Sequence, residues 1–204
     1  MSLTACNNLG LLDQLEKPGT ATSGGSKASA IFLFSTANTI TGSIRGGMAS
    51  TRLAADVQCA TTRGTLTFPD NACTQVHAVI SLPQEPPLNL NDGIADMPAR
   101  YGVPSDRSIN GPNNFVIAGD WFTLVAGMSG KSLADGAVMV GATNWWSFST
   151  LGGNYDGANN CSGGNDGVTG NGIIGNSSTT GNTWLSGGPT SCAATGIKFL
   201  CVCY

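Results

Sequence analysis

Charged side chains are scarce in this chain. Only 10% of its 204 residues carry charge, with 9 Lys and Arg against 12 Asp and Glu, and the net charge is −3. A nucleic-acid partner requires a basic surface that neutralises its phosphates. We therefore expect no nucleic-acid binding.

The chain also lacks a long apolar run. No segment has the roughly 18 consecutive apolar residues that a membrane-spanning helix requires. Residues 7–27 are polar and rich in Gly, Ser, Thr and Pro, which is typical of a flexible tether. Hydrophobic residues nevertheless make up 41% of the whole chain and include four Trp, which favours a compact fold. We expect a tether over residues 1–28 and a single domain over residues 29–204.

Signatures of catalysis are missing as well. His77 is the only histidine, and the carboxylates and nucleophiles near it in sequence form no recognisable catalytic constellation. No Gly-x-Ser-x-Gly nucleophile elbow occurs, and the loop at residues 42–47 has no lysine to hold a phosphate. We expect a binding module rather than an enzyme, without a cofactor. A secreted hydrolase with an unrecognised site is the most distant alternative.

One cysteine stands apart from the other six. Cys6 follows Leu3-Thr4-Ala5, an apolar residue and two small ones, which is the pattern that a bacterial lipoprotein signal peptidase requires. We expect an exported protein of the outer membrane or cell surface, anchored by a lipid on Cys6 and contacting the membrane through that lipid only. An ordinary exposed thiol is the alternative.

The remaining six cysteines are expected to form three disulfides, as suits an oxidising compartment. Zinc is disfavoured because Cys201 and Cys203 are too close for a Cys-x-x-Cys pair and only one histidine is present. Residues 197–204 have strand character, and the strand period of two puts both cysteines on one face. Cys59 and Cys73 are the available partners for that face.

Cys161 and Cys192 can close the long loop between them. Six cysteines still permit 15 pairings, so residue spacing alone leaves the connectivity open.

Apolar patterns predict the regular elements. Ser50 and Thr51 can cap a helix that runs to about Cys59. Its apolar stripe would consist of Leu53, Ala54, Val57 and Ala60. Short apolar runs predict strands at residues 30–35, 115–118, 121–125 and 145–148, and a strand or the start of a helix at residues 78–82. Turn-forming residues predict irregular structure over residues 89–114 and 150–188.

Several motifs occur in a characteristic order. A strand at residues 31–36 precedes Gly46-Gly47 and an Ala-Asp-x-x-Cys helix at residues 55–59. An Asn-Cys pair, a glycine-rich stretch, a Trp, a Ser-Cys pair and an aromatic-Leu-Cys-Val ending follow at residues 160–161, 172–175, 184, 191–192 and 199–202. Together these motifs resemble the leptospiral endostatin-like outer-membrane lipoproteins, whose domain has a C-type-lectin-like fold. Residues 161–164 depart from the pattern, which has a Trp after this cysteine.

The resemblance implies an α+β domain of short twisted antiparallel strands, one or two helices and long irregular loops, stapled by disulfides. It implies the bridges Cys59–Cys201 and Cys161–Cys192. Cys73 and Cys203 would then form an additional bridge, which the resemblance does not establish. The resemblance also implies that the protein is a surface adhesin for host proteins such as extracellular-matrix proteins, plasminogen or complement regulators.

The adhesin interpretation places ligand contacts in the loop region at residues 150–188 and on nearby aromatics. Strand alternation predicts that one of Trp145 and Trp146 points outward, and packing of both in the core is the alternative. The candidate contact residues are Trp145, Trp146, Asn159, Asn160, Asp166 and Trp184.

A calcium-dependent glycan-binding lectin is the second hypothesis. Oxygen ligands for calcium are present in Asp156, Asp166, Asn159, Asn160 and Asn165, but these residue types are equally good turn formers. The Glu-Pro-Asn, Gln-Pro-Asp and Trp-Asn-Asp triplets of sugar-binding C-type lectins are all absent. Calcium is therefore disfavoured.

Overall fold

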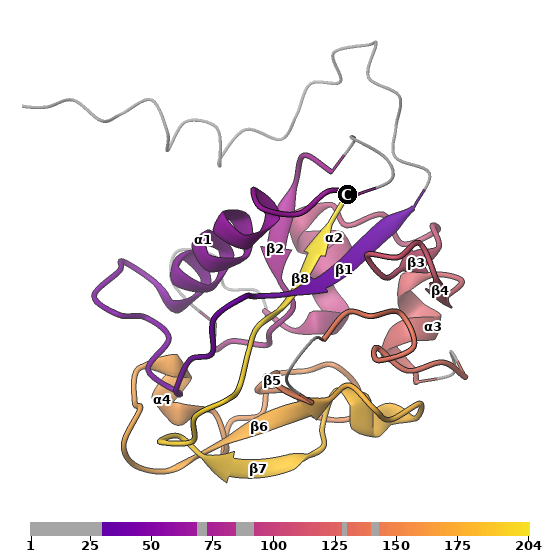
Figure 1. The fold of residues 1–204 in the computed structure, drawn as a ribbon. Helices are drawn as coiled ribbons and strands as arrows, with labels where there is room; N and C mark the ends of the chain where they lie inside the picture. The colour runs from indigo at the N-terminus through magenta and orange to yellow at the C-terminus, as the bar shows by residue number, and fades with distance from the viewer. Residues whose placement is uncertain (1–29, 69–72, 85–91, 128–129, 140–142) are drawn as a thin grey trace, which may run out of the picture.

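Two β-sheets carry the fold of this α+β domain (Figure 1). A five-stranded sheet has the order β2-β8-β1-β3-β4, and a three-stranded sheet has the order β5-β6-β7. The strands are β1 (Ile31–Ser35), β2 (Val76–Ala78), β3 (Ile109–Asn110), β4 (Val116–Ala118), β5 (Asn144–Trp146), β6 (Asn171–Asn176), β7 (Gly188–Ser191) and β8 (Leu200–Cys203). The helices are α1 (Thr51–Arg63), α2 (Met97–Tyr101), α3 (Trp121–Val125) and α4 (Cys161–Gly164), with short 3₁₀ turns at η1 (Ile94–Asp96) and η2 (Asn182–Trp184).

The structure is a computed structural model that describes residues 30–68, 73–84, 92–127, 130–139 and 143–204. The expected tether at residues 1–28 and the expected lipidation site Cys6 lie outside the described residues. Within the described ranges, no helix is both long enough and apolar enough to cross a membrane.

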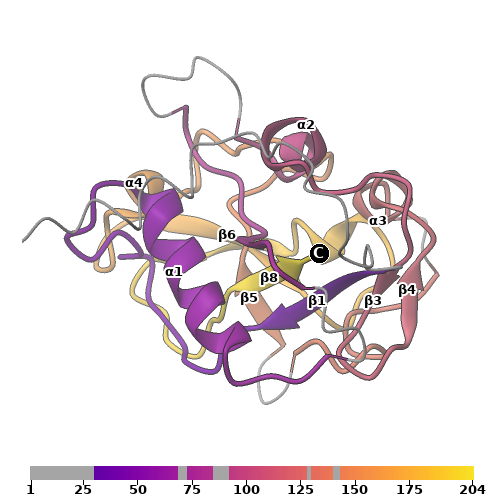
Figure 2. The ribbon, with the colours of Figure 1, turned by 90° about the horizontal axis from the view of Figure 1, so that it is seen from above.

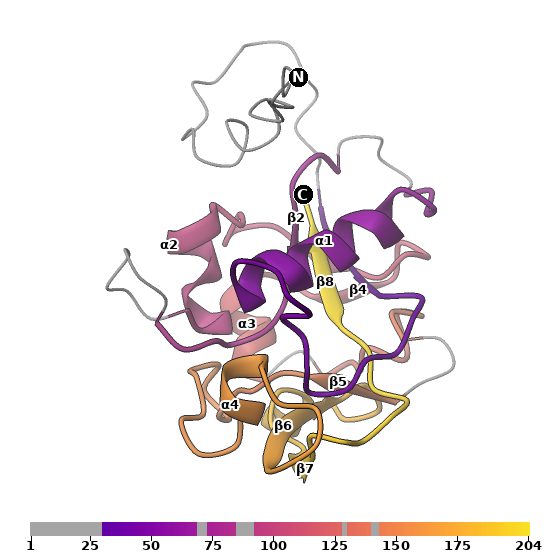
Figure 3. The same cartoon turned by 90° about the vertical axis from the view of Figure 1, so that its left-hand side faces the viewer.

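The inner strands β1 and β8 of the five-stranded sheet are buried on both faces. On β1, Phe32 and Phe34 belong to the core cluster that includes the inner side of α1, whereas Ile31 and Leu33 belong to the cluster that includes α2 and α3. Figure 2 shows α1 lying across the sheet, and Figure 3 shows the three-stranded sheet below it. A strand that is covered on both sides needs no polar face, which explains the uninterrupted apolar run that begins at Ala30.

Three disulfides join Cys59 to Cys201, Cys73 to Cys203, and Cys161 to Cys192. Cys201 and Cys203 belong to the same core cluster, as the strand period predicted. The prediction of three bridges is confirmed, and so are the two pairings that the resemblance implied. Bridges of this number suit an extracellular or otherwise oxidising environment.

Helix α1 begins where the sequence predicted and ends later. Ser50 is its N-cap, and the Ser50 hydroxyl accepts a hydrogen bond of 3.1 Å from the Leu53 amide. The predicted stripe is wrong, because Val57 is 40% exposed and the buried positions are Thr51, Ala54, Ala55 and Cys59. The bridge from Cys59 to Cys201 of β8 fixes which side of the helix faces the sheet.

Other expected elements differ from the structure. Residues 121–125 form helix α3 rather than a strand, because Asp120 is an N-cap whose carboxylate accepts from the Thr123 amide at 2.7 Å. Strands β1 and β3 pair in parallel, so the sheet is mixed and not purely antiparallel. The expectation of one or two helices is also wrong, since α2, α3 and the single turn α4 accompany α1.

Glycines of β6 make room for the aromatic residues of β5. Gly175 pairs with Trp145 across the strands, and a Cβ atom on Gly175 would overlap the Trp145 ring. A Cβ atom on Gly172 would lie 2.8 Å from the Trp146 ring and 2.7 Å from Phe148. The glycine-rich sequence of this segment is therefore a packing requirement, and strands β6 and β7 form where irregular structure was predicted.

Helix α4 is a single left-handed turn. Its residues Cys161, Ser162, Gly163 and Gly164 all have positive φ, between 51° and 81°. The Asn160 side chain accepts from the Gly163 amide at 2.7 Å, and the hydroxyl of the buried Thr51 donates to the Gly163 carbonyl at 2.8 Å. The departure from the family pattern at residues 161–164 coincides with this turn, where two glycines adopt a left-handed backbone at low cost.

Candidate functional site

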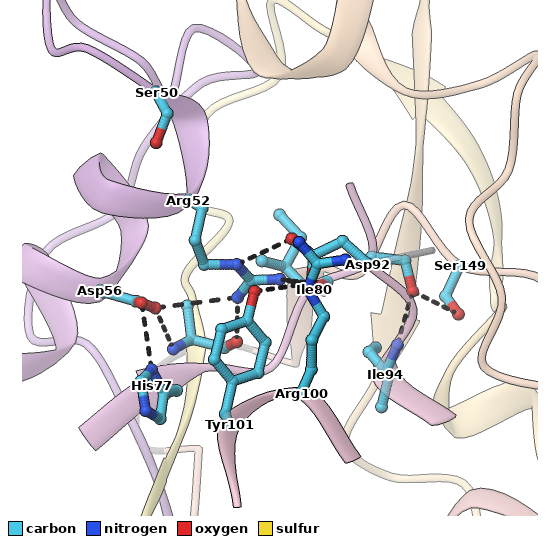
Figure 4. Close-up of polar contacts among 12 residues, drawn as sticks. Ser50, Arg52, Asp56, His77, Ile80, Asp92, Ile94, Arg100, Tyr101 and Ser149 are labelled. Carbon is cyan, nitrogen blue, oxygen red and sulfur yellow. Dashed lines mark hydrogen bonds and ion pairs between the residues drawn. The ribbon is translucent and has the colours of Figure 1, made fainter. Parts of the chain in front are cut away.

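A buried cluster of charged side chains lies where α1 and α2 meet the edge strand β2 (Figure 4). Arg52, in the first turn of α1, makes a bidentate pair with Asp92 at 3.1 and 3.0 Å. Its guanidinium also donates to the carbonyls of Ala78 and Ile80, each at 2.7 Å. Burial by itself lowers the pKa of Arg52, but the negative charges of Asp92 and Asp56 raise the pKa above its ordinary value. Arg52 is therefore a permanent cation in the interior.

Asp92 is the centre of this cluster. Its side chain is 5% exposed, and it accepts from the Tyr101 hydroxyl at 2.8 Å in addition to Arg52. The Arg100 guanidinium lies 3.6 Å from the same carboxylate. Burial raises the pKa of Tyr101 to about 12, with a further contribution from the charge of Asp92. The phenol keeps its proton at neutral pH and acts as a donor.

His77 and Asp56 form a second pair at the edge of the cluster. The His77 Nδ1 atom lies 3.1 Å from the Asp56 carboxylate, whose other oxygen accepts from the Ala78 amide at 2.8 Å. The His77 ring packs against Tyr101 with 4.7 Å between the ring centroids. Figure 4 shows Asp56 between Arg52 and His77.

A histidine oriented by a carboxylate supplies two of the three members of a hydrolytic triad. A triad requires a hydroxyl or thiol nucleophile within hydrogen-bond reach of the other ring nitrogen. Among the described residues, only Asp56 makes a hydrogen bond with the His77 ring, and the His77 side chain is 14% exposed. The pair links α1 to β2 and gives no support to the hydrolase alternative.

The three tryptophans proposed as ligand contacts lie in the core. Trp145 and Trp146 are 0% exposed and Trp184 is 3% exposed. Trp146 and Trp184 donate through their indole nitrogens to the carbonyls of Ile40 and Leu124, at 3.0 and 2.9 Å. No Trp of β5 faces outward, and the alternative that both Trp145 and Trp146 pack in the core is confirmed. The reason is that β5 is covered on both sides, with Trp145 and Trp146 in different core clusters.

The asparagine and aspartate residues of the loop region stabilise turns. One Asp156 oxygen accepts from the amides of Ala158 and Asn159 at 2.9 and 2.8 Å, and the Asn160 side chain caps the left-handed turn. These contacts do not place Asn159, Asn160 or Asp166 around a common ligand.

Asp166 forms a similar turn. Its carboxylate accepts from the amides of Val168 and Thr169 at 2.7 and 2.9 Å and from the Thr169 hydroxyl. These bonds hold the pKa of Asp166 below its ordinary value. Over the described part of the chain, no three His, Cys, Asp or Glu side chains are grouped to hold a metal ion. The side-chain oxygens of Asp156, Asn160 and Asp166, three of the five residues considered as calcium ligands, thus accept hydrogen bonds from the backbone.

The most exposed aromatic side chain is on α3. Phe122 is 63% exposed, and Val116 and Phe115, at the start of β4, are 52% and 36% exposed. We call these three residues the apolar face. Their neighbours Ile117 and Trp121 are buried, because the strand period and the short helix direct alternate side chains inward. The Lys131 ammonium lies 5.9 Å from the centre of the Phe115 ring.

No family model matches the chain, and no curated protein matches it significantly. The apolar face and the charged cluster are therefore interpreted from their own chemistry.

Sequence reasoning missed both features. The i, i+4 pair of Arg52 and Asp56 on a helix is a signal for an ion pair, but the partners Asp92 and Tyr101 come from a region predicted to be irregular. For the apolar face, a strand was predicted where α3 forms, so the outward position of Phe122 could not be derived.

Proposed function

We propose that this chain is a disulfide-stapled binding module, anchored at the bacterial surface by a lipid on Cys6, that recognises a host protein. Its ligand class would be extracellular-matrix proteins, plasminogen or complement regulators, as in the endostatin-like lipoproteins that it resembles. The bridges Cys59–Cys201 and Cys161–Cys192 support that resemblance and, with it, a C-type-lectin-like fold.

The apolar face is the observation that carries the proposal. Phe122 on α3 and Val116 on β4 are exposed apolar side chains on two elements that contact each other, and Phe115 directly precedes Val116. Exposed apolar side chains that gather on one surface mark interaction sites. Aromatic side chains also supply much of the energy of protein interfaces. The polar loop residues first considered as contacts are instead occupied with turns, so we place the contact on β4 and α3.

Solid-phase binding of the oxidised full chain to matrix proteins and plasma regulators tests the function. We expect saturable binding to at least one of them, and about tenfold weaker binding for Phe122→Ser, which removes a central aromatic contact. Val168→Ser is the matched control, because Val168 is 78% exposed but belongs to the loop region.

The possible outcomes are distinct. Binding that Val168→Ser weakens and Phe122→Ser leaves intact would move the contact back to the loop region. Absence of saturable binding to every protein tested would reject the adhesin proposal. Unfolding midpoints of both variants should match the parent, since each substitution changes an exposed side chain.

A further inference from the structure

A second surface feature is a hollow of about 290 Å³ beside α1. Its walls come from the segment that follows β1, between Thr36 and Ile40, and from Gln58, Thr61 and Thr62 of α1. Figure 2 shows this segment leaving β1 alongside α1. The hollow contains none of the residues of the apolar face or of the charged cluster.

The lining is polar and uncharged. Apart from Ile40, each side chain in it carries a hydroxyl or an amide. Three of the hydroxyls are already engaged. Thr36 donates to the Asn38 carbonyl at 2.9 Å, Thr61 donates to the Val57 carbonyl at 2.8 Å, and Thr62 accepts from the Ala37 amide at 3.4 Å. The side chains of Asn38, Thr39 and Gln58 make no hydrogen bond to any described residue, so their donors and acceptors are available to a ligand.

Both walls are fixed before any ligand arrives. The amides of Thr36 and Ile40 donate to the carbonyls of Phe199 and Ile197 at 3.0 and 2.7 Å, which ties the segment to the chain leading into β8. Helix α1 is fixed to β8 itself by Cys59, the residue after Gln58. The backbone of both walls is therefore held in place, which lowers the entropy that is lost when a ligand binds.

The chemistry of the lining selects the ligand class. An anion or a cation would need an opposite charge in the walls, and none lines the hollow. A hydrophobic peptide side chain would need more apolar surface than Ile40 offers. Amides and hydroxyls that both donate and accept, next to one aliphatic side chain, match a ring that carries several hydroxyls. We propose that the hollow binds an uncharged sugar without calcium.

Titration of the oxidised full chain with glucose, galactose, mannose and N-acetylglucosamine, followed by amide NMR shifts, tests the site. We expect at least one sugar to shift the resonances of Asn38, Thr39 and Gln58. Gln58→Ala should weaken binding about fivefold and the Asn38→Ala/Gln58→Ala variant about 25-fold, the effect of one and two lost hydrogen bonds. Ala is a strong helix former, so Gln58→Ala should leave α1 intact.

Asn171→Ala is the matched control, because Asn171 is an exposed amide on β6, and it should bind like the parent. Gln58→Trp should abolish binding by filling the hollow. Absence of shifts with all four sugars, or shifts confined to other residues, would overturn the proposal. Shifts produced by triglycine but by no sugar would assign the hollow to peptide recognition instead. Protein binding through the apolar face is unaffected by each of these outcomes, so the two proposals fail independently.

Discussion

The two sheets of this domain hold their shape by different means. The five-stranded sheet has apolar residues on both faces, a helix bridged to its inner strand β8, and a buried ion pair between Arg52 and Asp92. The three-stranded sheet relies on glycines packed against indole rings, aspartate turns, and one bridge that closes a separation of 31 residues. The region around the five-stranded sheet is stabilised by burial on both faces. The region around the three-stranded sheet is stabilised by close glycine packing and by hydrogen bonds between side chains and the nearby backbone.

Removing both bridges of β8 should have the largest effect. Replacing Cys59, Cys73, Cys201 and Cys203 by Ala releases two long-range cross-links and should lower the free energy of unfolding by about 8 kcal/mol in the chain-entropy model. A typical domain has about 5–15 kcal/mol in total, so this variant should be largely unfolded. Far-UV circular dichroism and urea titration measure the effect.

Single-bridge variants sharpen the comparison between the sheets. Cys73–Cys203 already joins nearly the same segments as Cys59–Cys201, so Cys59→Ala/Cys201→Ala opens only a short additional loop and should cost about 3 kcal/mol. Cys161→Ala/Cys192→Ala opens its full loop and should cost about 4 kcal/mol. A much larger loss for the first variant would mean that the two β8 bridges act independently.

Asp92→Asn tests the buried charge cluster of the first region. The variant leaves Arg52 charged and without its bidentate partner, and removing one member of a buried pair costs about 3–5 kcal/mol. Urea denaturation is the measurement. Tyr101→Phe, which deletes one hydrogen bond to Asp92, should cost about 1 kcal/mol.

Asp120→Asn is the control for the change of charge, because Asn also caps a helix well, and it should be nearly neutral. A loss below about 1 kcal/mol for Asp92→Asn would show that Arg52 finds other partners, and the cluster would then not stabilise the first region.

Gly175→Ala tests the packing of glycine against indole in the second region. The added methyl group would overlap the Trp145 ring and the Trp184 carbonyl, and forced overpacking costs about 1–3 kcal/mol. Gly157→Ala is the matched control, since no atom lies within 4 Å of its Cβ position. Equal unfolding midpoints for the two variants would contradict the requirement for glycine at β6.

Features that depend only on residue type and on the period of a strand or helix were predictable from the sequence. The apolar run at residues 30–35, the Ser50 cap and the shared face of Cys201 and Cys203 follow from strand and helix geometry, and the structure has all three. The stripe of α1 was wrong because a disulfide, which periodicity does not contain, decides the rotation of the helix.

The candidate site was less predictable. Asp92 pairs with Arg52 although 40 positions separate the two residues in the sequence, and no local sequence pattern predicts such a long-range pair. Trp145 and Trp146 were considered as contacts because strand alternation implies one exposed side chain, but the number of layers around a strand is a tertiary property. The turns that these residue types predict are present, since Asp156 and Asp166 accept from amides two and three residues ahead.

Acid and alkali should each destabilise a different one of the two regions, with smaller effects than the substitutions above. The folded-state pKa of Asp166 is lowered by bonds from Thr169, so its contribution is present above the unfolded pKa of about 3.9 and is lost as pH falls through the folded value. The pKa of Tyr101 is raised to about 12, so its contribution is complete below the unfolded pKa of about 10 and is lost as pH rises toward 12. Acid should therefore loosen the Asp166 turn first, and alkali should loosen the Arg52 cluster first.

Amide NMR shifts of Val168 and Thr169 report the effect of acid, and phenolate absorbance reports the effect of alkali. An Asp166 titration at or above its ordinary pKa would show that the turn is not held by this carboxylate, and the contrast between the regions would then rest on packing alone.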